Sequence, residues 1–251
     1  GIYRNVKLIT VNKVHVPIWG TFVTTPEVSS ESATVNVQIT VNNTMDKASK
    51  FNLITKIVDP TGKTVAMAEK VERSAPDKES VFTQSFKVNK PALWDTSKPN
   101  MYSALTLIQI DGTTIDSYTT PFGIRSIEFI PKKGFFLNGK ATLMKGVSLH
   151  HDGGLVGAAV PKEVWRRRLL SLKEAGLNAV RTAHNPFSEE FLDLCDELGI
   201  LVQHEFFDEF DYPKDKRLNM HERHDDYISR GYTEHFQQWG KRDLTSTMLR
   251  D

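Results

Sequence analysis

Three clusters of polar residues in the second half of the chain have the side-chain types that bind ligands or transfer protons. They are His150-His151-Asp152, the run from Arg181 to Pro186, and His204-Glu205 followed by Asp208-Glu209. Imidazole and guanidinium groups donate hydrogen bonds, and carboxylates accept them. Imidazole and carboxyl groups are also common general acids and bases. The clusters therefore suit either the binding of a polar ligand or acid–base catalysis.

Each cluster follows a short apolar run of the kind that forms a buried strand. The runs are Leu143–Val147, Ala179–Thr182 and Ile200–Gln203. Helical periodicity fills the two intervals, so the order is strand, helix, strand, helix, strand. This alternation predicts right-handed βαβ units and a parallel sheet. Ligands bind beyond the carboxyl ends of the strands in such sheets, where all three clusters fall.

Local signals define the two helices between these strands. The first begins at Pro161, which suits a first helical turn because its missing N–H would be unpaired there. Its apolar residues Trp165 and Leu169 fall on one face, and Gly176 ends it. The second helix runs from Ser188 to Gly199 and has two glutamates near its positive N-terminal end.

The region from residue 18 to residue 118 has an all-β character. From Val35 to Val41, apolar residues alternate with polar ones, as in a half-buried strand. Further apolar runs, separated by turn residues, follow at Phe51–Val58, Val65–Val71, Val81–Val88 and Tyr102–Ile110. This spacing predicts an antiparallel β-sandwich of about one hundred residues. It contains no titratable cluster, so we expect a packing or spacer module. Asn138-Gly139, further on, predicts a tight hairpin.

Composition excludes several classes of function. The chain has 251 residues, enough for two domains or one large barrel. Its 32 Lys and Arg residues balance 31 Asp and Glu residues, which gives no reason to expect nucleic acid or an anionic membrane as a partner. No apolar run approaches the length of about 18 residues that a membrane span needs. Cys195 is the only cysteine, and we expect a small buried hydrophobe that forms no internal disulfide.

Seven short motifs occur in order along the chain. They are Gly1-Ile2-Tyr3-Arg4, Pro91-Ala92-Leu93-Trp94 with Pro99-Asn100-Met101-Tyr102, Phe122-Gly123-Ile124-Arg125, Leu137-Asn138-Gly139-Lys140, Lys145-Gly146-Val147, Asn178 to Pro186, and Leu194 to Gly199. Each motif alone is a weak signal. Together they resemble glycoside hydrolase family 2, and within it the β-galactosidases.

The resemblance implies a string of modules. Residues 1–14 are similar to the last strand of a jelly-roll sugar-binding domain whose remainder is absent, and residues 15–124 to an immunoglobulin-like β-sandwich. Residues 125–251 are similar to the N-terminal part of a TIM-barrel catalytic domain. We therefore expect a fragment of a longer protein, with the sandwich followed by a truncated (β/α)8 barrel.

The resemblance also implies a reaction. Retaining glycosidases use two carboxyl groups about 5 Å apart, one a nucleophile and the other a general acid/base. In this family they are glutamates after the fourth and seventh barrel strands, the first of them in an Asn-Glu pair. No Asn-Glu dipeptide occurs here. We expect the parent protein to hydrolyse terminal β-galactosides without a cofactor, and this chain, which lacks both glutamates, to be inactive.

The sugar-holding side of the pocket is expected to remain. By motif, the resemblance assigns this role to His150, Arg181, His184, Glu205 and Asp208. Imidazole and guanidinium groups donate to sugar hydroxyls, a guanidinium also orients a neighbouring carboxylate, and Asp208 would accept from a hydroxyl.

Two residues near Glu205 depart from the family's Asp-Glu-Ala-Phe-Asp sequence. His204 replaces an acid and Phe206 replaces an alanine, which leaves the role of Glu205 open. Arg181 could instead be a structural ion-pair partner. Glu205 could also form a catalytic pair with Asp208 or Glu209, although carboxyl groups on one strand end do not flank a sugar from opposite faces.

The sequence also permits interpretations beyond the sugar pocket. The His-x-x-His pattern at His221 and His224 could bind a metal, but a solvated charge run explains it more simply. The protein could be a non-catalytic carbohydrate-binding or scaffold protein, a β-glucuronidase or a β-mannosidase. A periplasmic or secreted location is favoured, with a signal peptide upstream. Three parallel strands cannot close a barrel, so we expect self-association through the open edge or a mobile segment beyond Asp211.

Overall fold

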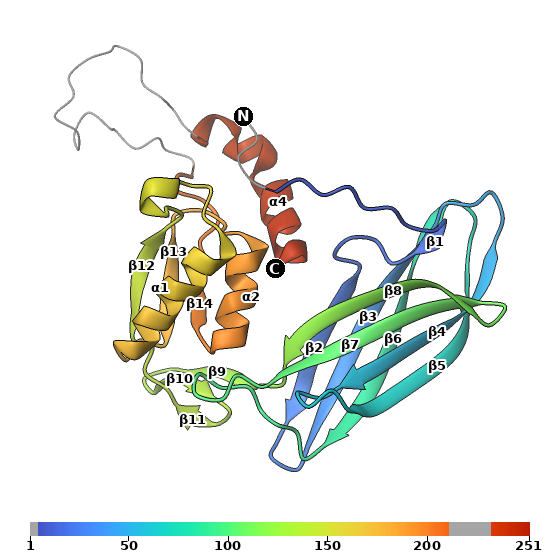
Figure 1. Ribbon diagram of the computed structural model, residues 1–251, viewed down its shortest axis with the longest axis horizontal. Helices are drawn as coiled ribbons and strands as arrows, with labels where there is room; N and C mark the ends of the chain where they lie inside the picture. The colour runs from blue at the N-terminus through green and yellow to red at the C-terminus, as the bar shows by residue number, and fades with distance from the viewer. Residues whose placement is uncertain (1–4, 211–231) are drawn as a thin grey trace. The chain divides into compact units, whose positions relative to one another are not determined.

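The computed structural model describes residues 5–210 and 232–251 (Figure 1). The chain divides into two compact units. Of the described residues, the first contains 5–144 and 196–199, and the second contains 145–195, 200–210 and 232–251. Within the described residues, no helix combines the length and the apolar character that crossing a membrane would require.

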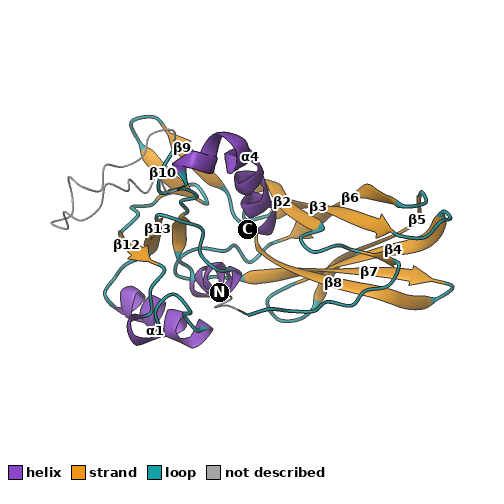
Figure 2. Ribbon diagram, turned by 90° about the horizontal axis from the view of Figure 1, so that it is seen from above, coloured by secondary structure: helices purple, strands orange, loops and turns teal. Residues whose placement is uncertain are grey.

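The first unit is built around a sandwich of two antiparallel sheets, as predicted (Figure 2). In one sheet, the central strand β3 pairs with β1, β2 and β6; in the other, the order is β5-β4-β7-β8. The strands of the first sheet are β1 (Val14–His15), β2 (Thr21–Val28), β3 (Ser32–Asn43) and β6 (Lys78–Asn89). Those of the second are β4 (Ser49–Val58), β5 (Thr64–Ser74), β7 (Met101–Ile110) and β8 (Thr113–Gly123).

The sandwich core follows from the alternation along the strands. The apolar residues of β3 from Val35 to Val41 all point inward and have no exposed surface. Leu53 and Ile57 of β4, and Ile108 of β7, cover them from the other sheet and are also fully buried. The four further apolar runs that predicted strands correspond to β4, β5, β6 and β7. Each observed strand extends beyond the predicted run at one or both ends. The prediction did not delimit β2 and β8, because neither has a regular apolar alternation.

A three-stranded meander follows the sandwich. It comprises β9 (Ile127–Ile130), β10 (Gly134–Leu137) and β11 (Lys140–Ala141). Asn138 and Gly139 form the predicted tight turn, with φ angles of +52° and +73°. Both angles lie in the left-handed region that this hairpin turn requires and that Asn and Gly tolerate best. The side-chain amide of Asn138 also accepts a hydrogen bond from the Ser126 N–H and donates one to the Trp94 carbonyl oxygen.

The second unit contains the predicted βαβ arrangement. Strands β12 (Gly146–His150), β13 (Ala179–Ala183) and β14 (Leu201–Gln203) are parallel and adjacent in that order. They are connected through the 3-10 helix η1 (Gly154–Val156) and the helices α1 (Lys162–Glu174) and α2 (Glu189–Leu198). Helix α4 (Thr233–Arg250) follows.

Aromatic side chains pack α1 and α2 together. Trp165 and Leu169 of α1 are fully buried, as are Phe187 and Phe191. The Phe191 ring centroid lies 4.9 Å from that of Trp165 and 4.7 Å from that of Phe187. Cys195 is buried on the same face of α2, which confirms that prediction.

The first parallel strand begins three residues later than the apolar run Leu143–Val147 predicted. Leu143 and Met144 precede β12 and are 73% and 46% exposed. Pairing with β13 sets the start of the strand instead, because Gly146 lies opposite Ala179. A Cβ atom at Gly146 would come within 2.7 Å of the Ala179 carbonyl oxygen, so this close approach requires glycine.

The N-terminal segment shows less regular structure. Residues 5–12 form no strand in the described chain, and Val6 and Leu8 are exposed. The expectation that residues 1–14 are a strand of a further domain therefore stays a prediction.

The Ile39→Ala substitution tests whether the sandwich core stabilises the first unit. Ile39 is fully buried, so we expect the free energy of unfolding to fall by about 2–5 kcal/mol. Val71→Ala on the solvent-facing side of β5 is the control and should change it by less than about 1 kcal/mol. Urea unfolding of both variants measures this. Equal losses would contradict the assignment of Ile39 to the core.

Candidate sugar-binding site

The parallel strands bring the three polar clusters to one edge of the sheet. His150 is the last residue of β12, and it lies opposite Ala183, the last residue of β13. His184 therefore follows β13 directly, and Glu205 lies two residues beyond the end of β14. Because the strands are parallel and in register, side chains from different parts of the sequence meet at their carboxyl ends.

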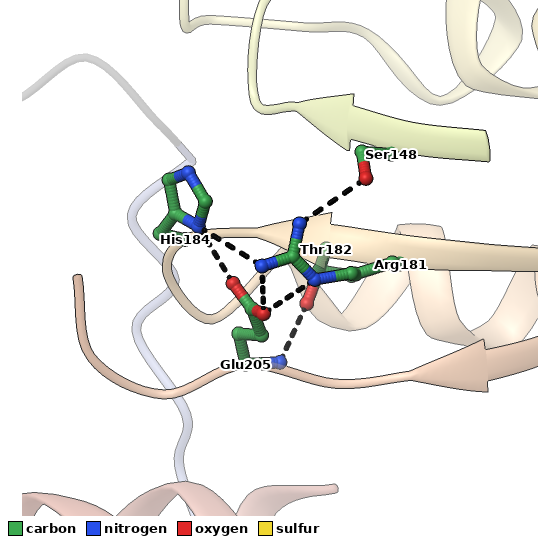
Figure 3. A network of polar contacts seen from close by, with 5 residues as sticks. All are labelled: Ser148, Arg181, Thr182, His184 and Glu205. Carbon is green, nitrogen blue, oxygen red and sulfur yellow. Dashed lines mark hydrogen bonds and ion pairs between the residues drawn. The ribbon is translucent and has the colours of Figure 1, made fainter.

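Arg181, His184 and Glu205 form a connected network (Figure 3). The Nε atom of Arg181 donates to Oε1 of Glu205 at 2.5 Å, and a second guanidinium nitrogen forms an ion pair with the same oxygen. Nδ1 of His184 lies 2.8 Å from Oε2 of Glu205. Both carboxylate oxygens are therefore engaged, which fixes the orientation of Glu205.

Ser148 and Thr182 extend this network. Arg181 donates to the Ser148 hydroxyl at 3.2 Å, and Ser148 lies opposite Arg181 in the β12–β13 register. The fully buried Thr182 hydroxyl accepts a hydrogen bond from the Glu205 N–H at 2.9 Å. Sequence reasoning assigned neither residue to the site: Ser148 looks like an ordinary strand residue, and Thr182 was included only as a member of the polar run from Arg181 to Pro186. The sheet register is the signal that could have identified Ser148.

The surroundings of Glu205 favour its ionised form. Burial alone raises its pKa, but hydrogen bonds from His184 and Arg181, together with the positive charge of Arg181, outweigh that effect. The pKa of Glu205 is therefore below its usual value of 4.5. Glu205 is a carboxylate at neutral pH, and Nδ1 of His184 is assigned as its hydrogen-bond donor.

The remaining two predicted site residues are His150 and Asp208. The His150 and His184 rings meet edge to face, with centroids 5.5 Å apart. The peptide bond between Ala183 and His184 is cis. Asp208 is exposed on the stretch after Glu205, outside the network of Figure 3. The structure therefore brings together four of the five predicted residues.

His204 and Glu209, which also belong to the third polar cluster, lie outside the network of Arg181, His184 and Glu205. His204 is largely buried, and its Nε2 atom lies 3.5 Å from a carboxylate oxygen of Asp251. Burial lowers the pKa of His204, and Asp251 opposes that effect. Glu209 is also buried, and its carboxylate accepts a hydrogen bond from the Thr233 hydroxyl at 3.2 Å. Glu209 thus connects the segment after β14 with the first residue of α4.

No grouping of three or more His, Cys, Asp or Glu residues suited to a metal ion occurs within residues 5–210 and 232–251. The His-x-x-His pattern at His221 and His224 lies outside the described residues, as does the start of the segment beyond Asp211.

The Glu205→Gln substitution tests whether the charge of Glu205 stabilises the folded chain through Arg181 and His184. We expect a loss of about 1 kcal/mol in the free energy of unfolding at pH 7, a modest value because Arg181 is 37% exposed. Folding lowers the pKa of Glu205, so ionised Glu205 stabilises the folded state. This stabilisation is complete above pH 4.5, the usual pKa of a glutamate, and is lost as the pH falls through the lower pKa that Glu205 has in the folded chain.

Urea unfolding of wild type and variant at neutral and acidic pH measures this difference. Glu128→Gln, on exposed β9, is the control and should leave stability nearly unchanged at both pH values. A Glu205→Gln difference that persists undiminished in acid would contradict the proposed charge pairing.

Comparison with known proteins supplies the family. Residues 14–125 match the model described as glycosyl hydrolases family 2, and residues 129–226 match the TIM barrel domain of the same family. These matches agree with the predicted fold class, an immunoglobulin-like sandwich followed by the start of a TIM barrel.

Individual relatives agree with the family models. The chain is 39% identical over 251 residues to beta-galactosidase BoGH2A of Bacteroides ovatus, covering 100% of this chain and 28% of that protein. It is 31% identical over 209 residues to a beta-glucuronidase of Bacteroides fragilis, covering 80% of this chain and 30% of that protein.

A solved structure supports the same conclusion. The structure of a glycosyl hydrolase family 2 member from Bacteroides cellulosilyticus is 36% identical, with a TM-score of 0.85 over 96% of this chain and 29% of that one. The chain therefore spans less than a third of the length of each of these relatives. In sequence and in fold, this chain belongs to glycoside hydrolase family 2.

Proposed function

We propose that this chain supplies the sugar-holding side of the active site in a retaining exo-glycosidase that releases terminal β-galactosyl residues. The convergence of Arg181, His184 and Glu205 at the carboxyl ends of parallel strands carries the proposal. In it, these three residues bind the terminal sugar together with His150 and Asp208. Their donors and acceptors match the hydroxyl groups of a neutral sugar.

The network suggests how this binding works. Glu205 is ionised, so it accepts hydrogen bonds from sugar hydroxyls while Arg181 and His184 hold it in place. With Nδ1 directed at Glu205, His184 presents its Nε2 atom to the ligand. Because the side chains already restrain one another, little conformational entropy is lost when the sugar binds.

We further propose that the catalytic carboxyl pair lies outside this chain. A general acid must be protonated at the working pH, whereas the low pKa of Glu205 keeps it ionised. Both of its oxygens are also engaged by Arg181 and His184, which opposes attack on the sugar as a nucleophile. Glu209 is buried against Thr233, which argues against a direct role in the reaction. The chain alone is therefore expected to be inactive, and the whole protein active.

One observation favours a galactoside over a glucuronide. A site for a glucuronide needs a cation that is free to bind the sugar carboxylate. The guanidinium of Arg181 is already paired with Glu205, so its charge is largely neutralised. The 39% identity to a beta-galactosidase supports the same choice.

Hydrolysis assays test this function. Chromogenic β-galactoside, β-glucuronide and β-mannoside substrates would be offered to the whole protein and to this chain. We expect hydrolysis of the galactoside by the whole protein alone. Arg181→Ala in the whole protein should lower kcat/KM by at least about tenfold. Activity in the chain would show that Glu205, Asp208 or Glu209 does the chemistry, and inactivity of both would favour a binding or scaffold protein.

We also infer that the chain self-associates through strand β12. Among the described strands, β12 pairs only with β13, so one edge of its backbone has no neighbouring strand in that part of the chain. Such an edge pairs readily with the same edge of a second copy. Val147 on this strand is partly exposed and contributes an apolar side chain to that contact.

Sedimentation velocity over a range of concentrations measures this association. We expect the mass to rise with concentration, and Val147→Lys to shift the equilibrium toward the monomer because a lysine on an edge strand opposes pairing. Val156→Lys, in η1, is the control and should leave the equilibrium unchanged. A chain that stays monomeric at every concentration would contradict the inference.

A further inference from the structure

The tight turn of the meander contains Asn138, the only asparagine in the sequence that is followed by glycine. An asparagine side chain can react with the backbone nitrogen of the next residue, and glycine hinders this approach least because it has no Cβ atom. The reaction, deamidation, converts asparagine to aspartate or isoaspartate. Asn138 is half-buried and Gly139 is exposed, so water reaches the turn.

Deamidation at this position would take place in two steps. The Gly139 nitrogen bonds to Cγ of Asn138, the Cγ–Nδ2 bond breaks, and Nδ2 leaves as ammonia with the proton of the Gly139 N–H. Water then opens the five-membered imide ring. Breaking the bond from the ring nitrogen to Cγ gives aspartate, and breaking its bond to the backbone carbonyl carbon gives isoaspartate. The sum is an exchange of water for ammonia, without oxidation or reduction.

The backbone of the turn opposes the first of these steps. Ring closure requires Cβ of residue 138 and the nitrogen of residue 139 to lie on the same side of the Cα–C bond. The φ angle of Asn138 is +52°, in the left-handed region. With ψ about +47°, which is typical of that region, the two atoms lie nearly opposite each other across the bond. The folded turn therefore keeps the Gly139 nitrogen away from the side chain that it would attack.

Hydrogen bonds also hold the side-chain amide of Asn138. Its Oδ1 atom accepts from the Ser126 N–H at 3.0 Å, and its Nδ2 atom donates to the Trp94 carbonyl oxygen at 3.0 Å. The backbone N–H of Asn138 donates to the Ser126 carbonyl oxygen at 2.9 Å. Rotation of the amide toward Gly139 would break both side-chain bonds.

The segment around Trp94, which accepts one of these bonds, is itself firmly packed. The Trp94 side chain is fully buried, and its backbone N–H donates to the Ile124 carbonyl oxygen at 2.9 Å. The Arg125 guanidinium lies over the indole ring, 4.4 Å from its centroid. This segment cannot follow the amide of Asn138 if that amide turns, so the reaction requires local opening of the meander.

We propose that Asn138 is a deamidation site that the folded meander protects, and that its products cannot restore the contacts of the turn. Aspartate offers only acceptors at neutral pH, so an oxygen would face the Trp94 carbonyl oxygen where Nδ2 now donates. Isoaspartate adds a methylene group to the backbone, so a two-residue turn can no longer join Leu137 to Lys140 in the same register. The site lies in the first unit, so the proposal does not depend on the proposed glycosidase function.

Mass spectrometry measures the reaction in the folded chain. The chain is incubated in a mildly alkaline buffer beside a synthetic peptide of residues 134–140, which has no meander to protect it. Trypsin cleaves after Lys133 and Lys140, so digestion of the chain releases the same peptide. We expect deamidation to be at least about tenfold slower in the folded chain than in the peptide. A sample digested without incubation corrects for deamidation during digestion.

Two variants test whether opening of the meander sets this rate. Phe135→Ala removes a buried ring from β10, so we expect the deamidation rate of the chain to rise toward that of the peptide. Ile127→Ala is the control, because this β9 side chain is 49% exposed and its loss should leave the rate unchanged.

The Asn138→Asp substitution reproduces one product of the reaction. It removes the donor to Trp94, so the urea concentration at the midpoint of unfolding should fall by about 0.5 M. Asn89→Asp makes the same change at the exposed end of β6 and should leave the midpoint unchanged.

Four results would overturn the proposal. A peptide that stays intact would show that Asn138 is not a deamidation site. A folded chain that reacts as fast as the peptide, or an unchanged rate in Phe135→Ala, would contradict protection by the meander. An unchanged midpoint in Asn138→Asp would show that the turn accommodates aspartate.

Discussion

The hydrogen bonds between the parallel strands β12, β13 and β14 are the constraint on which the candidate site depends. Their register places Ser148 opposite Arg181, and Arg181 opposite Gln203 at the end of β14. A shift of one residue would turn Arg181 to the other face of the sheet and separate it from Glu205. Burial of Trp165 and Phe191 fixes the helices between the strands. The site thus follows from backbone pairing first and from side-chain chemistry second.

Charge compensation explains how Glu205 can be an anion where water is partly excluded. Burial opposes its ionisation, and two hydrogen-bond donors on β13 and just beyond it more than offset that effect. Such a network is satisfied within the protein before any ligand arrives. It therefore resembles a preorganised binding site more than a reactive pair of carboxyl groups, whose pKa values would have to differ strongly for the two to act as acid and nucleophile.

The sequence predicted those features that local chemistry determines. The alternation of β3, the Asn138-Gly139 turn and the burial of Cys195 each depend on a few neighbouring residues. The start of β12 was predicted wrongly, because an apolar run shows that a strand is present but does not show where its pairing begins. The directions of His204 and Glu209 could not be predicted either, since side chains beyond a strand end follow their tertiary neighbours, here Asp251 and Thr233.

The strand order of the sandwich has a consequence for synthesis on the ribosome. β4 pairs with β7, so Asn52 lies opposite Gln109, and the second sheet is not complete until β8 has emerged. Until then the valine-rich inner face of β3 lacks its cover and is a β-prone apolar surface open to other nascent chains. The βαβ units that follow have more local contacts and are expected to fold faster. Any need for chaperones therefore falls on the synthesis of the sandwich, before the residues of the candidate site are made.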